Sequence, residues 1–289
     1  MFQRHQQRES DLGAKEYTDI LYTKKDHIAR ITINRPEVLN AFTNNTLLQM
    51  IEALDDASKD ETIGVVVMSG AGDRAFSAGG DVKWEQEGGL ADTAMSEPAD
   101  IHQAIRRCRK PVIAAVKGYA IGGGNHMVYF CDLTIAAENA IFGQNGPRVG
   151  SPAEGLTVAY LTRVIGAKRA REMWYLCRRY TAQQALEWGL VNAVVPLEKF
   201  DAEVDKWCQE ILDRSPTCIR ILKTSFDTEF DYMRGYRFGH FQSQLAPHYY
   251  QSAEPHEGTQ AFLEKRQPDF RKFLSANPPA VAPSTEQSE

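Results

Sequence analysis

Hydrophobic residues recur along this chain with two different periods. In residues 28–33 (IARITI) they alternate with polar residues, which predicts a half-buried strand. In residues 43–59 leucine and isoleucine recur every three or four positions, which predicts a helix with one buried face. The two patterns continue as far as Ala136. They predict further strands at 20–22, 65–68, 111–116 and 133–136, and helices at 101–109 and 125–130.

Beyond Leu156 the helical period dominates. One strand, at 190–195, interrupts it. The predicted helices cover 158–164, 168–176, 182–189, 200–213 and 216–226, with helical segments continuing to Phe273. The recurrence of strand, loop and helix in the first half indicates an α/β unit with mixed or parallel strands, followed by a helical region.

Three segments lack either period. Residues 1–16 are polar and residues 275–289 are rich in Pro, Ala, Ser and Glu, so we expect both to be disordered. Residues 83–99 contain acidic residues and glycines, and we expect them to form a mobile loop over a site. These segments divide the rest into a core at 17–205 and a C-terminal helical region at 206–274.

Two glycine-rich turns each follow a predicted strand. The first is FSAGGD, ending at Asp81, and the second is GYAIGGGN, ending at Asn125. Glycine allows a ligand to approach the main chain closely, and the free N–H groups at a helix start favour negative charge. Two such turns can aim two backbone N–H donors at one oxygen, as in an oxyanion hole. The alternative is a pair of tight connections without a ligand.

Neither turn is typical of a nucleotide site. The first and second turns both lack the G-x-G-x-x-G spacing of dinucleotide-binding folds and the GK[ST] ending of a P-loop. The formal charge of −5 gives no broad electrostatic reason to bind nucleic acid or an anionic membrane. No apolar run reaches the length of a membrane span, and the polar start does not look like a secretory signal. The five scattered cysteines indicate reduced thiols of a cytoplasmic protein, with no metal site.

Several motifs taken together resemble the crotonase (enoyl-CoA hydratase/isomerase) superfamily. They are residues 31–42 (ITINRPEVLNAF), the two glycine turns in this order, and residues 131–137 (CDLTIAA), and the similarity extends over about 17–273. Within the superfamily, residues 141–151 (IFGQNGPRVGS), 167–180 and 264–270 (EKRQPDF) are most similar to the 1,4-dihydroxy-2-naphthoyl-CoA synthases. The 2-ketocyclohexanecarboxyl-CoA hydrolases are almost as similar.

The resemblance implies a β/α spiral core with a C-terminal helical oligomerisation region, in a homotrimer or a hexamer made of two trimers. It implies that the N–H groups of Gly80 and Gly123 bind the thioester carbonyl oxygen of an acyl-CoA substrate. CoA arrives with that substrate, and no tightly bound cofactor is expected. The residues that would line the acyl-CoA channel are Leu39, Ala41, Ala78, Asp81 and Lys83. Phe262 and Lys265 would reach the adenine and 3′-phosphate, although a core role for the former and a solvated charge for the latter remain open.

The two glutamates of the superfamily's hydratases are replaced here by His126 and Gly146. Adding water requires a paired acid and base, so simple hydratase chemistry is disfavoured. Gln144 with Gly146 instead matches the naphthoyl-CoA synthases, whose catalytic base is a bound bicarbonate. Ser151 and Tyr250 also match functional positions of that enzyme.

The chain departs from the synthase pattern at three positions. Ala153, followed by Glu154, stands where the synthases have an aspartate, and Leu90 is nearest to the position of the tyrosine in their mobile loop. His126 replaces an apolar residue, and a helix start would hold its imidazole neutral and available as a base near neutral pH. A structural role for His126 and an exposed charge for Glu154 remain open alternatives.

These residues leave three functional hypotheses. The first is an enzyme that makes or breaks a C–C bond beside a CoA thioester in a cyclic substrate, either by condensation or by ring hydrolysis. The second is an enoyl-CoA hydratase or dehydratase that uses His126 or Glu154. The third is an acyl-CoA binder without catalytic activity.

Overall fold

A computed structural model describes residues 17–86, 100–151, 153–228, 249 and 252–273. The strands are β1 (Ile20–Lys25), β2 (Ile28–Ile33), β3 (Val65–Gly70), β4 (Ala75–Ser77), β5 (Val112–Val116), β6 (Tyr119–Ile121), β7 (Leu133–Ala137), β8 (Ile141–Gly143), β9 (Arg179–Thr181) and β10 (Ala193–Val195). The α-helices are α1 (Asn44–Lys59), α2 (Val82–Gln86), α4 (Ile101–Arg107), α5 (Gly123–Phe130), α6 (Gly146–Val149), α7 (Leu156–Ile165), α8 (Ala167–Leu176), α9 (Ala182–Glu187), α10 (Phe200–Leu212), α11 (Pro216–Thr228) and α14 (Ala253–Leu263). Short 3-10 helices are η1 (Pro36–Val38), η3 (Leu197–Lys199) and η6 (Phe270–Phe273).

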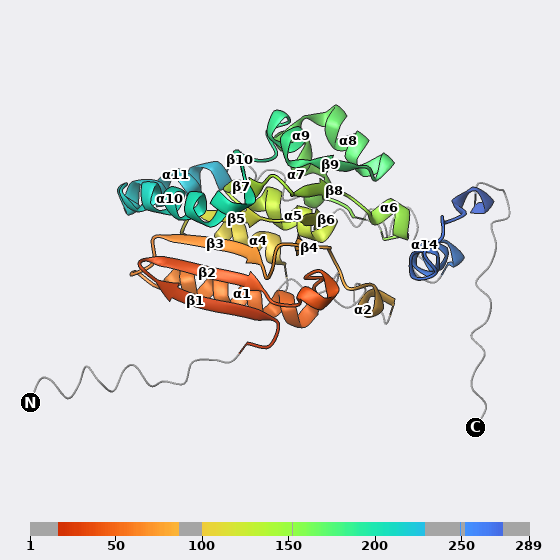
Figure 1. The fold of residues 1–289 in the computed structure, drawn as a ribbon, viewed down its shortest axis with the longest axis horizontal. Helices are drawn as coiled ribbons and strands as arrows, with labels where there is room; N and C mark the ends of the chain where they lie inside the picture. The colour runs from red at the N-terminus through yellow and green to blue at the C-terminus, as the bar shows by residue number, and fades with distance from the viewer. Residues whose placement is uncertain (1–16, 87–99, 152, 229–248, 250–251, 274–289) are drawn as a thin grey trace, which may run out of the picture.

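The larger sheet in the described part of the chain has the order β1-β2-β3-β5-β7-β10. The β1–β2 pair is antiparallel, whereas the other pairs are parallel. Successive side chains of a strand point to opposite faces. Val66 and Met68 of β3 accordingly join the core cluster that contains residues of α1 and α4, whereas Val65 and Val67 join the cluster that includes Phe200 of α10. Helices therefore cover both faces of this sheet (Figure 1).

A second sheet, with the order β4-β6-β8-β9, forms beside the first. Strands β4, β6 and β8 are parallel, and β9 closes the sheet in the antiparallel direction. The carboxyl ends of the three parallel strands lie at one edge, where α/β folds commonly bind ligands. The residues that follow them are the first glycine turn, the second glycine turn and Gln144. This sheet therefore brings together segments that are far apart in the sequence.

The predicted fold class is confirmed, and the longer elements lie close to their predicted bounds. Residues 83–99, expected to be a loop, instead begin within α2, and residues 87–99 lie outside the described residues. Asp81 starts this helix, because its Oδ1 accepts from the Lys83 N–H at 3.1 Å and its carbonyl accepts from the Glu85 N–H at 2.9 Å. The strand predicted at 190–195 begins only at Ala193.

The C-terminal helices include α10, α11 and α14. Helix α14 packs against α6, at the edge of the molecule away from α10 and α11 (Figure 1). Among the described helices, none combines the length and the hydrophobicity that crossing a bilayer requires. The expected disordered ends, 1–16 and 275–289, lie outside the described residues.

Candidate active site

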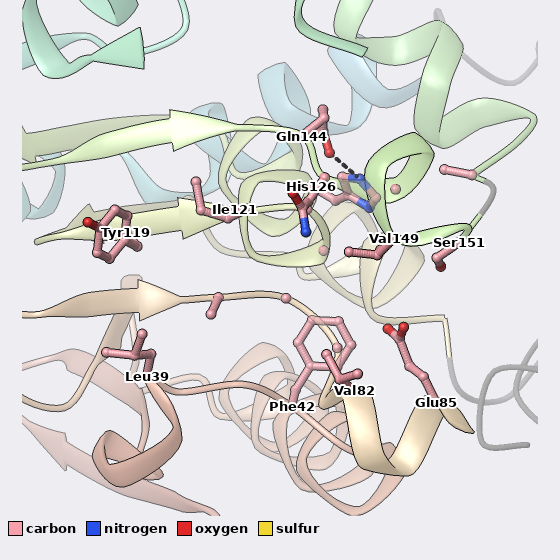
Figure 2. Close-up of a pocket in the computed structure, with 18 of the residues that line it drawn as sticks. Leu39, Phe42, Val82, Glu85, Tyr119, Ile121, His126, Gln144, Val149 and Ser151 are labelled. Carbon is pink, nitrogen blue, oxygen red and sulfur yellow. Dashed lines mark hydrogen bonds between the residues drawn. The ribbon is translucent and has the colours of Figure 1, made fainter. Parts of the chain in front are cut away.

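A cavity of about 550 Å³ opens between the two glycine turns (Figure 2). One wall comes from the first turn and α2, and the other comes from the second turn, α5 and the segment after β8. Gly79 and Gly80 line the first wall, and Gly122 and Gly123 line the second. The two turns are in contact, since a Cβ on Gly79 would lie 3.4 Å from the Gly123 nitrogen.

The N–H group of Gly80 is left free by the local strand pairing. Phe42 and Gly80 form a parallel bridge in which Phe42 donates to the Gly79 carbonyl at 2.9 Å and accepts from the Asp81 N–H at 2.9 Å. Such a bridge uses the main-chain groups of Phe42, so those of Gly80 point to the other edge. Within the described chain, no acceptor pairs with the Gly80 N–H.

The N–H group of Gly123 is free for a different reason. Gly123 is the first residue of α5, where an N–H has no partner in the preceding turn. Gly122 precedes it with a φ of 56°, a conformation that favours glycine, and donates to the Gly143 carbonyl at 3.0 Å. A Cβ on Gly123 would collide with the ring of Phe42. The wall of the cavity therefore has two adjacent unpaired amide donors, as an oxyanion hole requires.

His126 and Gln144 form a hydrogen-bonded pair across the second wall. The His126 Nε2 lies 3.0 Å from the Gln144 Oε1, as the dashed line in Figure 2 marks. With Oε1 as acceptor, His126 donates through Nε2 and keeps the lone pair on Nδ1. Gln144 is fully buried, and its Nε2 has no hydrogen-bond partner among the described residues. That amide group can donate to an acyl oxygen, a water or an anion.

The imidazole of His126 is held neutral. Burial and, to a smaller extent, the nearby His102 lower the pKa of His126 to about 3, and the Gln144 hydrogen bond only partly opposes them. The ring of His126 lies 5.8 Å from that of His102 and 5.4 Å from that of Trp174, measured between centroids. The expected neutrality is therefore found, although burial rather than the helix start is its main cause. An imidazole with this pKa is a weak base.

Glu85 lines the opposite wall and was not among the predicted site residues. Its carboxylate points from α2 into the cavity (Figure 2), so close to Gly80 that a Cβ there would collide with it. Burial raises the pKa of Glu85 to about 7, and the charge of Asp81 contributes in the same direction. The sequence does place Glu85 four residues after Asp81, where the first glycine turn ends, but the burial of its side chain could not be predicted.

Asp100 and His102 form a pair that also lines the cavity, and neither was predicted as a site residue. Asp100 begins α4 and accepts from the His102 N–H at 3.0 Å, and its Oδ1 lies 3.1 Å from the His102 Nδ1. The His102 Nε2 is buried and has no hydrogen-bond partner among the described residues. The remaining wall is largely apolar and aromatic, with Phe42, Trp84 and Trp174 among its residues. An aromatic wall suits a flat or cyclic acyl group.

The structure places the other predicted catalytic residues differently. Gly146 and Ser151 line the cavity. A Cβ on Gly146 would collide with the Ser151 carbonyl oxygen, so this glycine is explained by the tight packing of α6. Glu154 is exposed and does not line the cavity. Tyr250 lies outside the described residues, while the neighbouring Tyr249 donates to the Gly150 carbonyl at 3.0 Å.

The residues expected to contact CoA also divide into two groups. Leu39, Ala78 and Phe262 line the cavity, and Lys265 lines a second cavity of about 390 Å³ that shares Phe262 with the first. Lys83 is exposed and does not line either cavity. Ala41 is buried behind the wall, and Asp81 lies 3.2 Å from Arg35 in an ion pair that anchors the first glycine turn.

The fold and this cavity define a class of α/β proteins in which two glycine turns bring main-chain N–H groups to one cavity. The family model for enoyl-CoA hydratase/isomerase matches residues 23–273, and the chain belongs to that family, the crotonase superfamily of enzymes acting on CoA thioesters.

Solved structures of the same family are similar over most of the chain. An enoyl-CoA hydratase from Mycobacterium avium subsp. paratuberculosis K-10 is 30% identical, with a TM-score of 0.78, over 88% of this chain and 99% of that one. A methylmalonyl-CoA decarboxylase in complex with 2-nitronate-propionyl-CoA is 27% identical, with a TM-score of 0.76, over 88% and 99%. A carnitinyl-CoA hydratase from Mycobacterium avium is 28% identical, with a TM-score of 0.74, over 86% and 97%.

Proposed function

We propose that this enzyme makes or breaks a C–C bond next to the thioester of a cyclic acyl-CoA. The main support is the aromatic-walled cavity that opens at two unpaired amide donors, Gly80 and Gly123. In the condensing direction an enolate carbon attacks a carbonyl of the same molecule and closes a ring. In the hydrolytic direction water adds to a ring ketone and the C–C bond breaks to leave the enolate.

Both directions place negative charge on the thioester oxygen. Two fixed donors stabilise that oxygen more in the enolate than in the ground state, which lowers the barrier. The neutral pair of His126 and Gln144 adds polar contacts at the acyl end without adding charge. We expect Gln144 Nε2 to donate to the second carbonyl of the substrate, because it is buried and lacks a partner among the described residues.

Bicarbonate supplies the base in the synthase reaction that the sequence resembles. The Gln144 amide suits an anion, but the Ser151 carbonyl oxygen occupies the space that the missing Gly146 side chain would take. These residues therefore do not form a site for bicarbonate. Turnover is expected to be the same with and without added bicarbonate.

A hydratase or dehydratase is the second candidate. Glu85 and His126 approach the cavity from opposite walls, as an acid and base acting on one water would (Figure 2). Two of the similar structures named above are hydratases. The low pKa of His126 counts against this candidate, because it makes the imidazole a weak base for activating water.

One panel of substrates separates these functions. The protein is incubated with 2-succinylbenzoyl-CoA, 2-ketocyclohexanecarboxyl-CoA and crotonyl-CoA, and products are identified by mass spectrometry. Loss of water from the first or gain of water by the second supports the proposal. Hydration of crotonyl-CoA alone identifies a hydratase, and CoA-ester binding without any turnover identifies a binder.

We also propose that the chain forms a homo-oligomer, a trimer or a hexamer, through its helical region. Large apolar side chains are exposed on α8 and on α11, including Tyr175 at 72% and Phe226 at 68%. Exposed patches of this kind often mark protein interfaces. Light scattering measures the mass directly, and a monomer at micromolar concentration would contradict the proposal.

A further inference from the structure

One carboxylate lies beside the oxyanion hole without a hydrogen-bond or ion-pair partner among the described residues. Glu85 is on α2, four residues after Asp81, which begins that helix and holds it against the first glycine turn. The carboxylate borders Gly80, whose N–H is one of the two donors. An acyl-CoA with its thioester oxygen at these donors therefore has its adjacent carbon near Glu85.

We propose that Glu85 is the catalytic residue that moves the proton to and from the acyl carbon next to the thioester. This inference rests on the proposed enolate chemistry. Nothing in the sequence motifs assigns this role to Glu85, because the glutamates of the family's hydratases correspond to His126 and Gly146.

The surroundings of Glu85 suit proton exchange near neutral pH. Among the described residues, no hydrogen-bond donor or cation contacts its carboxylate. Burial and the nearby Asp81 raise its pKa to about 7, so both protonation states are populated at neutral pH. Asp81 itself is paired with Arg35 and faces away from the cavity wall.

The other charged and titratable groups that face this cavity are engaged elsewhere. Burial keeps His126 neutral, and His102 shares its Nδ1 with Asp100. Arg179 donates to the Gln144 carbonyl at 3.1 Å rather than to a carboxylate. Glu85 is therefore the lining carboxylate without a hydrogen-bond donor in the described part of the chain.

The proton transfer balances in both directions of the proposed reaction. In condensation, the Glu85 carboxylate takes the proton as the C–H bond breaks, and the electron pair moves to the thioester oxygen held by Gly80 and Gly123. The enolate carbon then attacks the carbonyl carbon of the substrate's carboxyl group, and the hydroxyl of that group leaves as water with the proton that Glu85 holds. Hydrolysis is the reverse: ionised Glu85 takes a proton from the water whose oxygen adds to the ring ketone. The C–C bond then breaks, its electron pair forms the same enolate, and Glu85 gives the proton to the enolate carbon, which leaves a new carboxylic acid.

Hydrogen exchange at the acyl carbon tests this step without knowledge of the natural substrate. Wild-type enzyme is incubated with butyryl-CoA in deuterium oxide, and deuterium next to the thioester is measured by mass spectrometry. We expect exchange to accelerate with pH and to level off above the Glu85 ionisation. Glu85→Gln should slow it at least ~100-fold, the range of general-base effects, and Glu85→Asp should retain part of it.

Glu210→Gln is the matched control, because Glu210 is exposed on α10 and does not line the cavity. It should exchange like wild type. Butyryl-CoA affinity and circular dichroism check that each variant folds and binds. Exchange by Glu85→Gln at the wild-type rate overturns the role of Glu85 but not the proposed enolate chemistry. If Glu85→Gln does not fold, a wild-type exchange rate that does not change with pH overturns the role of Glu85. Wild type that binds the ester without exchange overturns the proposed function itself.

Discussion

The two arms of the site differ in what surrounds them. The arm that contains Gly123 belongs to α5, a helix whose residues are almost all buried and whose His126 is hydrogen-bonded and neutral. The arm that contains Gly80 leads into α2, a five-residue helix whose Glu85 titrates near neutral pH. Each arm offers one main-chain donor, and in the proposed reaction the arm that contains Gly80 also moves the proton.

This difference separates two requirements of enolate chemistry. Donors to an oxyanion act best when they are preorganised, and a buried helix start provides that. A proton-transfer group must change charge during the reaction, which needs a pKa near the working pH. Placing both tasks on one rigid arm would require α5 to hold a changing charge among buried apolar residues, which is costly.

Removing a donor from the α5 arm should have the largest effect. Gly123→Pro lacks the N–H and should raise the barrier by about 3–4 kcal/mol, which lowers turnover roughly 10²- to 10³-fold. Gly123→Ala keeps the N–H and only displaces the Phe42 ring, so it should retain more activity. Equal activities for both variants, with ester binding intact, would show that this N–H is not a donor to the substrate.

The ionisation of Glu85 on the α2 arm should also change the free energy of unfolding with pH. Because the folded-state pKa of Glu85 is raised to about 7, its ionisation opposes folding. The free energy of unfolding of wild type should therefore fall as pH rises from about 4.5 through 7, by at most about 3 kcal/mol. In Glu85→Gln this contribution should be absent, as denaturant titrations at several pH values can measure. Parallel curves for both proteins would contradict the buried carboxylate.

Changing His126 should have a smaller effect. His126→Asn keeps an amide that can donate to Gln144 but loses ring packing, and we expect about a tenfold loss of turnover. The pH–rate profile should keep its shape between pH 5 and 9, because the His126 pKa lies near 3. Loss of an ionisation near neutral pH in this variant would instead identify His126 as the titrating base.

The smallest effect tests the electrostatic coupling within the α2 arm. The charge of Asp81 raises the pKa of Glu85, so Asp81→Asn should lower the midpoint of hydrogen exchange, by less than about one pH unit. Asp73→Asn is the matched control, because Asp73 pairs with Lys117 at 2.7 Å and does not line the cavity. An upward shift in Asp81→Asn would contradict this coupling.

The sequence predicted the arms better than it predicted their surroundings. The glycine turns are recognisable because each follows an apolar strand and contains residues that only a close approach of the main chain explains. The strands β4, β6, β8 and β9 span three residues each, which is too short to show a period, so the second sheet was missed. Short strands of this kind form because they pair with neighbouring strands, which come from other parts of the sequence.

The chemical difference between Glu85 and His126 could not be predicted either. Both were visible as ionisable residues near the glycine turns, but a pKa depends on burial and neighbours that come from distant segments. His102 approaches His126 from the separate helix α4, and burial is the main cause of the raised pKa of Glu85. Sequence position alone favoured His126 as a base, whereas the structure favours Glu85.

The central claim is that Gly80 and Gly123 polarise the thioester while Glu85 moves the proton. Infrared difference spectra of a carbonyl-labelled acyl-CoA measure that polarisation directly. The carbonyl stretch should move to lower frequency on wild type and on Glu85→Gln, although the latter exchanges slowly, and should shift less on Gly123→Pro, which keeps only the Gly80 donor. An unshifted stretch in the wild-type complex would contradict the account.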